Sequence, residues 1–259
     1  MIKRRPLMKA PNKWLVAVVI AWGPTLALMD STIITIILSR LQIAFHTDLG
    51  TITWVSTAYY LAQAGVIPVV GYVSDRLGSK LVFITSLALF TVSSLLCALA
   101  PTQEALIAFR VLQGIGGGAL VPIALAIVFR LFPPNQQGLV TAIMSIPIML
   151  APTFGPTIGG YLISSFDWNA VFLINVPLGL VTLFLSFLVL PKQSKQAKGI
   201  NKSFDIAGLL LSMVGATALI YGISEVAAKG WSEATVWASL LIGVAALIAF
   251  AVIELRVRV

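Results

Sequence analysis

Long apolar stretches separated by short polar gaps run along almost the whole chain. Each stretch is about 20 residues long and lacks the strict alternation that marks a membrane-facing strand. At about 1.5 Å per residue, a helix of this length crosses a hydrocarbon core about 30 Å thick. The pattern therefore predicts an all-α integral membrane protein with eight transmembrane helices. We expect them at residues 14–38, 51–73, 80–100, 104–130, 138–164, 170–190, 205–223 and 234–254.

The composition agrees with lipid as the surrounding medium. Hydrophobic residues make up 59% of the chain and charged residues only 10%, and the mean hydropathy is +1.00, whereas about 25% of residues in soluble domains are charged. The single cysteine, Cys97, cannot form an intrachain disulfide, and a single histidine, His46, argues against a histidine-based metal site. The polar gaps hold no nucleophile–base set. We therefore expect neither an enzyme nor a bound metal or cofactor.

The basic residues report the topology. The chain has 17 Lys and Arg against 9 Asp and Glu, and the basic residues fall in the gaps between apolar stretches. If the N-terminus is cytoplasmic, 14 of the 17 lie on that side, Arg40 and Lys229 lie outside, and Arg110 lies within a span. The positive-inside rule then predicts a multi-pass protein of the cell membrane with both termini in the cytoplasm. Because topology explains the positive charge, nucleic acid is not an expected partner.

A basic linker divides the predicted spans into six and two. It covers residues 191–203, with four lysines and no acidic residue. Topology alone explains the lysines, and a dedicated site for anionic lipids is the alternative. The predicted segments are a cytoplasmic basic N-terminus (1–13), six spans (14–190), the linker (191–203), two further spans (204–254) and a cytoplasmic end (255–259).

The gap after the second predicted span carries a charged motif. It reads GYVSDRLGSK and contains Gly71, Asp75, Arg76, Gly78 and Lys80. We expect Gly71 to allow close helix packing, Gly78 to permit a tight turn, and the charges to form a network that breaks when helices move. The segment resembles the loop signature G-x-x-x-D-R-x-G-x-K of the major facilitator superfamily.

A second motif begins with an arginine inside the fourth predicted span. Arg110, Gln113, Gly114 and Gly117 follow one another at positions i, i+3, i+4 and i+7 and therefore share one helix face. A charge within a span is costly and is a functional candidate for that reason. The motif resembles R-x-x-Q-G-x-G of the same superfamily.

Residues 114–119 also fit the dinucleotide pattern G-x-G-x-x-G/A. No acidic residue follows before Asp167, so no nucleotide is expected.

The fifth predicted span contains APTFGPTIGG, in which Ala151, Gly155 and Gly159 repeat every four residues. We expect this small-residue seam to pack closely against another helix and the mid-helix Pro156 to bend the span. Pro152, Gly155, Pro156, Gly159 and Gly160 resemble the antiporter signature of the superfamily. Ala142 and Ala151 stand where that signature usually has glycine, so the seam is less permissive.

Three other stretches resemble the 14-span drug:proton antiporter branch of the superfamily. The segment DWNAVFLINVPLG, which includes Asn175, is similar to the start of its sixth span, although Trp168-Asn169-Ala170 replaces the usual Trp-Arg-Trp. Residues 203–231 are similar to its seventh span. In the first span, LMDSTIITIIL resembles its acidic motif through Asp30, with Thr35 in place of asparagine. The resemblance implies a six-span half of two inverted three-span repeats, followed by two further transmembrane helices.

The resemblance implies export of amphipathic, often cationic, small molecules in exchange for protons. The expected proton-coupling and substrate residues are Asp30, Arg110, Gln113, Tyr59 and Gln63. From the expected ends of their spans, Asp30 lies about 12 Å deep and Arg110 about 9 Å deep, so the two charges can pair. The alternative for Asp30 is a water-facing carboxylate, and for Tyr59 and Gln63 it is ordinary helix packing.

The resembling branch has six more spans than the eight expected here. We therefore expect the chain to be an N-terminal portion whose C-terminal six-span half is absent. A missing half or a periplasmic adaptor is then a candidate partner, besides protons, the lipid bilayer and the transported molecule. The alternative function is a truncated, non-transporting membrane protein that binds or regulates a full-length transporter.

Overall fold

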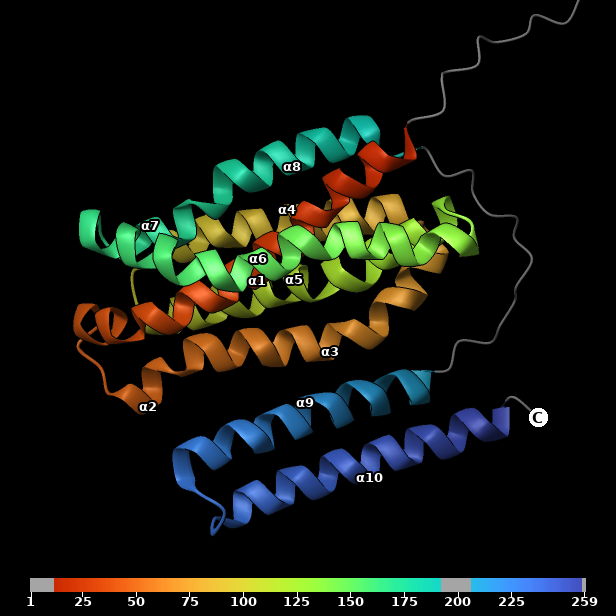
Figure 1. Cartoon of the computed structure of the whole chain (residues 1–259). Helices are drawn as coiled ribbons and strands as arrows, with labels where there is room; N and C mark the ends of the chain where they lie inside the picture. Colours follow the sequence, from red (N-terminus) through yellow and green to blue (C-terminus); the bar gives the residue numbers. More distant parts are fainter. Residues whose placement is uncertain (1–11, 192–205, 258–259) are drawn as a thin grey trace, which may run out of the picture.

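A computed structural model describes residues 12–191 and 206–257, and over these residues the chain is helical with no strand (Figure 1). The helices, in chain order, are α1 (Lys13–Ala44), α2 (Leu49–Ile52), α3 (Trp54–Leu77), α4 (Ser79–Ala98), α5 (Gln103–Leu131), α6 (Pro134–Ser165), α7 (Asn169–Leu173), α8 (Asn175–Val189), α9 (Ile206–Lys229) and α10 (Ala234–Val257). The predicted all-α architecture is confirmed. Most of the predicted basic N-terminus (1–13) and linker (191–203), and the last two residues of the predicted cytoplasmic end (255–259), lie outside the described residues.

Seven helical stretches in the described part of the chain are long and apolar enough to cross a membrane. The remaining predicted span, 51–73, corresponds to α3, which has 24 residues but is not among the seven. Its tyrosines, glutamine and hydroxyl residues lower its hydropathy, and part of this polar face is turned inward, since Tyr59 is fully buried. The chain is therefore a multi-pass membrane protein in which α3 relies on its neighbours to cover polar groups.

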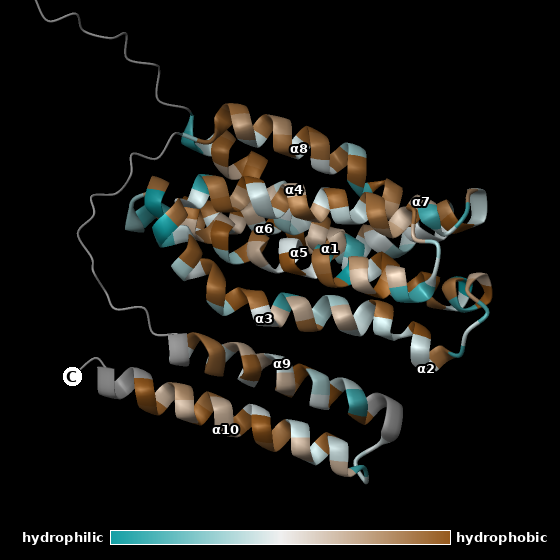
Figure 2. Cartoon of the chain, turned by 180° about the vertical axis from the view of Figure 1, so that it is seen from behind, coloured by the Kyte–Doolittle hydropathy of each residue, from teal (hydrophilic) through white to brown (hydrophobic). Residues whose placement is uncertain are grey.

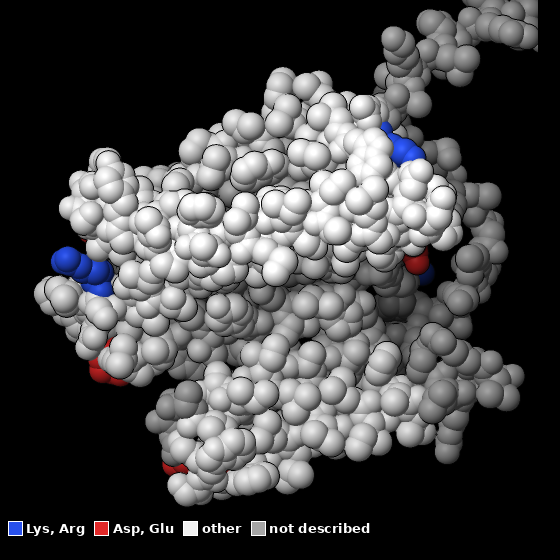
Figure 3. Space-filling view, viewed as in Figure 1, with Lys and Arg blue, Asp and Glu red and all other residues white. Residues whose placement is uncertain are grey.

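The surface between the two ends of the bundle is apolar. In Figure 2 hydrophobic residues predominate along the helices, and hydrophilic residues gather toward the ends and loops. On the face seen in Figure 3, charged side chains lie at the two ends with uncharged surface between them. Most of α1 is buried, whereas α6 and α10 leave most of their side chains exposed. Helix α1 is therefore central, and α6 and α10 present apolar side chains outward, as lipid contact requires.

Several helix boundaries differ from the predicted spans; α9, for example, continues to Lys229 instead of ending near residue 223. Helix α1 continues to Ala44 instead of ending near residue 38, because Leu41 is still buried against the bundle. The span predicted at 170–190 is divided into α7 and α8 at Ile174. Pro177 has no backbone N–H to donate to the carbonyl of Leu173, four residues earlier, so the helical hydrogen-bond ladder is interrupted there.

Helices α9 and α10 form a hairpin that packs on α3 through α9 (Figure 1). Leucines of each helix lie against glycines of the other: Leu247 meets Gly215, Leu240 meets Gly222 and Leu219 meets Gly243. Such small-residue contacts hold helices together where apolar lipid offers no hydrophobic driving force. The two spans predicted after the linker are therefore present as a closely packed pair.

Glycines in α5 bring it into direct backbone contact with two neighbours. A Cβ atom at Gly114 would lie 2.5 Å from the carbonyl oxygen of Tyr59 in α3, and one at Gly116 would lie 2.6 Å from the backbone nitrogen of Phe90 in α4. A Cβ at Gly118 would lie 2.7 Å from the Cα of Gln63. Helix α5 can therefore occupy the space between α3 and α4 only because these positions lack side chains.

Replacing Gly116 with alanine is expected to destabilise the protein by about 1–3 kcal/mol, because the added methyl group meets backbone that cannot yield easily. Gly160→Ala is the matched control, since a Cβ at Gly160 in α6 meets nothing within 4 Å. The control should be neutral or stabilising by up to about 1 kcal/mol, as alanine favours helix over glycine. Unfolding in mixed detergent micelles measures both, and equal effects of the two variants would contradict the packing role of Gly116.

Candidate functional site

The two charges predicted to pair within the membrane are in direct contact. Asp30 lies in the middle of α1 and Arg110 lies in the second turn of α5, and Arg110 Nη1 donates to Asp30 Oδ2 at 2.5 Å. The side chains are 1% and 0% exposed. Burial excludes the alternative of a water-facing carboxylate for Asp30. A charged pair in this position is costly unless it is well satisfied, and such pairs mark functional sites.

Two amide side chains bind the other oxygen of the carboxylate. Asp30 Oδ1 accepts hydrogen bonds from Gln113 Nε2 at 3.1 Å and from Asn175 Nδ2 at 2.8 Å. Gln113 lies one turn after Arg110 in α5, and Asn175 is the first residue of α8, directly after the break at Ile174. Hydrogen bonds to an ionised carboxylate are stronger than neutral ones. The negative charge of Asp30 therefore links α1 to both α5 and α8.

The guanidinium of Arg110 is enclosed by other groups as well. Its Nη1 also donates to Gln113 Oε1 at 2.6 Å, and its Nε donates to the carbonyl of Val55 in α3 at 3.0 Å. The ring of Tyr59 lies 4.0 Å from the Arg110 Cζ, and the ring of Phe172 in α7 lies 5.8 Å from it. Aromatic faces stabilise a cation in a desolvated site. The Arg110 Nη2 has no hydrogen-bond partner among the described residues.

Helix α4 joins the network through Gln113. Gln113 Nε2 donates to Ser94 Oγ at 2.6 Å, and the Cys97 thiol lies 3.6 Å from Gln113 Oε1. The sequence singled out neither Ser94 nor Val55, because a serine in an apolar run and a backbone carbonyl give no distinctive signal. Asn175 lies in a stretch with a family resemblance but was not predicted as a site residue. An amide at the start of a span was the signal that could have identified it.

Helix α3 carries the predicted Tyr59 and Gln63 and a further aromatic residue, Trp54. Tyr59 is fully buried beside Arg110, and its hydroxyl donates to the Ala27 carbonyl at 3.0 Å. Gln63 packs on the glycine face of α5, since a Cβ at Gly117 would lie 3.2 Å from its Nε2. Trp54 points elsewhere, and its ring lies 6.0 Å from that of Tyr221 in α9. Tyr59 therefore belongs to the charged network and Gln63 borders it, whereas Trp54 joins α3 to the hairpin.

The charged loop motif lies at the opposite ends of the helices. Arg130, at the end of α5, donates from Nη2 to Asp75 Oδ1 in α3 at 2.9 Å, with the two side chains 37% and 72% exposed. An ion pair this exposed contributes about 0–1 kcal/mol. It joins the ends of α3 and α5 on the surface, so the predicted loop network has Arg130 as an additional member.

The rest of the motif is partly as predicted. Gly78 has φ of 89°, a left-handed conformation that glycine adopts without strain, and it forms the predicted tight turn between α3 and α4. Lys80 Nζ donates to the carbonyls of Phe187 and Leu190 at the end of α8, and the Arg76 guanidinium lies 4.6 Å from the Tyr72 ring. The prediction for Gly71 is wrong, because a Cβ there would meet nothing within 4 Å. Gly71 faces outward from the described helices and closes no contact between them.

The antiporter-like segment of α6 packs against α1 just after Asp30. A Cβ at Gly155 would collide with the Thr32 hydroxyl, and one at Gly159 would lie 2.8 Å from a methyl group of Ile33. The predicted seam is therefore confirmed for these two glycines and for Ala151, which is buried. Gly160, Pro152 and Pro156 face outward from the bundle. The seam fixes α6 to the helix that carries the buried carboxylate.

Residues 20–256 match the family Major Facilitator Superfamily. The chain is 39% identical over 205 residues to "Multidrug resistance protein B homolog" of Mycobacterium tuberculosis (strain CDC 1551 / Oshkosh), covering 79% of this chain and 37% of that protein. It is 32% identical over 245 residues to "Riboflavin transporter RibZ" of Clostridioides difficile (strain 630), covering 95% of this chain and 51% of that protein. The chain thus spans between about a third and about half of these relatives.

Solved structures share the fold. A crystal structure of a D-xylose-proton symporter superposes with a TM-score of 0.61 at 17% sequence identity, covering 94% of this chain and 68% of the other. The identity is low, so the likeness concerns the helical architecture alone.

Proposed function

The chain belongs to the Major Facilitator Superfamily, and on this basis we propose that it forms part of a proton-coupled antiporter that exports small amphipathic molecules. The family and the relatives support a transporter rather than an enzyme. Exchange for protons, a cationic substrate and operation without a cofactor are our proposals. The proposed setting is the cell membrane, with both termini cytoplasmic.

The observation that carries the proposal is the buried Asp30 carboxylate held by Arg110, Gln113 and Asn175. A proton that binds Asp30 removes the negative charge that attracts these donors. The contacts of α1 with α5 and α8 then weaken, and the helices can rearrange. Release of the proton restores the charge and the contacts. The carboxylate thus alternates between two states that favour different helix arrangements, which is what coupling requires.

The substrate is proposed to exchange with the proton on the same carboxylate. A cationic amphiphile that approaches Asp30 competes with both the proton and Arg110 for the negative charge. Nearby aromatic rings, above all Tyr59, offer faces for a flat cation. The relative named a multidrug resistance protein supports a small organic molecule as cargo. The relative named a riboflavin transporter supports a cargo of similar size. Riboflavin differs in charge from a cationic amphiphile.

The orientation is supported by contacts at one end of the bundle. The Asp75–Arg130 pair joins the ends of α3 and α5, Lys80 reaches the end of α8, and Lys13 at the start of α1 donates to Gln136 of α6 at 2.6 Å. These basic residues therefore share one end of the molecule. The positive-inside rule assigns that end to the cytoplasm.

A transport assay tests the proposed function. The protein that contains this chain is reconstituted in liposomes loaded with a fluorescent cationic dye, and a proton gradient is imposed. We expect dye movement against its concentration gradient that stops when a protonophore is added. Dye movement that ignores the protonophore would contradict proton coupling. Dye movement by residues 1–259 reconstituted alone would exclude the alternative function, because a non-transporting regulator moves no dye.

A further inference from the structure

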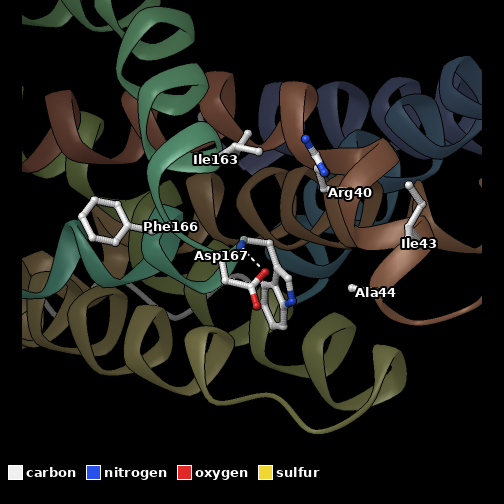
Figure 4. Close-up of a pocket in the computed structure, with 7 residues that line it drawn as sticks. Arg40, Ile43, Ala44, Ile163, Phe166 and Asp167 are labelled. Atoms are coloured by element: carbon white, nitrogen blue, oxygen red, sulfur yellow. Dashed lines mark hydrogen bonds between the residues drawn. The ribbon is translucent and has the colours of Figure 1, made fainter.

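A second polar site lies away from the buried pair, where α1 and α6 end and the loop to α7 begins. A pocket of about 180 Å³ opens there. In Figure 4 Arg40, Ile43 and Ala44 of α1 lie on one side, and Ile163, Phe166 and Asp167 lie on the other. Pockets for drug-sized ligands measure about 300–1,000 Å³. This pocket is too small for a transported drug, and its size suits a small polar group.

The pocket holds one positive and one negative side chain that do not pair with each other. Asp167 Oδ1 accepts from the backbone nitrogen of Trp168 at 2.7 Å, whereas its Oδ2 has no partner among the described residues. The Arg40 guanidinium likewise makes no hydrogen bond or ion pair with the described part of the chain, in which the ion pairs are those of Asp30 and Asp75. The pocket therefore offers separate binding groups for an anion and for a cation.

Apolar side chains stand beside these charges in the lining of the pocket and continue into the lipid-facing surface. Ile43 is 67% exposed and Phe166 is 63% exposed at its mouth. Arg40 is also one of the two basic residues that topology does not place on the cytoplasmic side. An arginine at the end of a transmembrane helix lies at the depth of lipid phosphates. A ligand of this pocket can therefore be charged at one end and apolar at the other.

We propose that this pocket binds the headgroup of a phospholipid that carries both a phosphate and a primary ammonium group, as phosphatidylethanolamine does. The phosphate accepts hydrogen bonds from Arg40, whose guanidinium suits a bidentate contact. The ammonium group donates to the free oxygen of Asp167. The acyl chains lie along the exposed side chains of α1 and α6. The lining of this pocket shares no residue with the Asp30 network.

Lipid binding to the purified, delipidated protein tests the proposal. Native mass spectrometry compares phosphatidylethanolamine with phosphatidylcholine and phosphatidylglycerol that have the same acyl chains. We expect phosphatidylethanolamine to bind about tenfold more tightly, because a trimethylated or absent amine cannot donate to Asp167. Asp167→Asn should remove this preference. Arg40→Gln should weaken phosphatidylethanolamine and phosphatidylcholine by a similar factor, since both contain the phosphate.

Glu104→Gln is the matched control, because Glu104 is an exposed acid at the start of α5, on the same end of the bundle. It should keep the wild-type preference. All three variants change exposed side chains, and their melting in detergent should match the wild type. Equal wild-type affinity for the three lipids, or loss of the preference in Glu104→Gln, would overturn the proposal. Displacement of the lipid by free phosphoethanolamine at equal concentration would also overturn it, by indicating a soluble ligand.

Discussion

Replacing Asp30 with asparagine is expected to abolish proton-driven efflux of a cationic dye while the protein still folds and inserts. Asparagine keeps an oxygen that accepts from Arg110 but cannot bind and release a proton near neutral pH. The Val55 carbonyl, the Gln113 side chain and the Tyr59 ring still surround the guanidinium. The variant should therefore lose the coupling step and keep the fold. Dye transport in liposomes with an imposed proton gradient measures the loss.

Two comparisons make this result specific. Dye exchange without a proton gradient should also fall in Asp30→Asn, because the cationic substrate is proposed to exchange with the proton on the same carboxylate. Asp48→Asn is the matched control, since Asp48 is an exposed carboxylate that caps α2 through Thr51 and lies outside the network. It should transport as the wild type does. Normal proton-driven efflux by Asp30→Asn would mean that another residue couples the proton.

Replacing Arg110 with glutamine is expected to lower the free energy of unfolding by about 3–5 kcal/mol, because it leaves the buried Asp30 charge without its cation. The amides of Gln113 and Asn175 still donate to the carboxylate but carry no charge. Unfolding in mixed detergent micelles measures the change. The double variant with Asp30→Asn should be less destabilised than the sum of the two single variants, by about 1–3 kcal/mol.

The exposed ion pair between Arg130 and Asp75, which are also an arginine and an aspartate, supplies the control. Arg130→Gln breaks the ion pair with Asp75 and should cost less than about 1 kcal/mol, since water and salt screen the exposed charges. Arg110→Gln and Arg130→Gln therefore make the same chemical change at different depths. Equal effects of the two would mean that burial of the Asp30–Arg110 pair has little energetic consequence.

Much of the architecture could be predicted from the sequence, because hydrocarbon restricts the choices severely. Apolar runs of sufficient length must become helices, so the spans and their order follow from hydropathy alone. The spacing of Arg110, Gln113 and Gly114 places them on one face of α5. The antiparallel course of the two spans predicted that Asp30 and Arg110 could meet, although α1 continues to Ala44, beyond the end at residue 38 used in the depth count. These features depend on helix geometry, which is the same in every helix.

The tertiary structure alone decided which faces meet. The antiporter-like motif of α6 includes Gly155, Gly159 and Gly160, yet only the first two contact α1. Gly71 belongs to a well-matched motif but faces outward. A helix pattern specifies which residues share a face, but the rotation of that face depends on the packing of all neighbouring side chains.

The packing of the helices also decided which residues make up the buried site around Asp30 and Arg110. Asn175, Ser94 and the Val55 carbonyl come from three different helices and meet at one point, although 120 residues separate Val55 from Asn175. The pocket between Arg40 and Asp167 likewise joins segments distant in sequence. Hydropathy and local spacing carry no information on such long-range neighbours. The sequence by itself determined the helices and two central charges, and the packing of α1 against α5 and α8 decided what surrounds those charges.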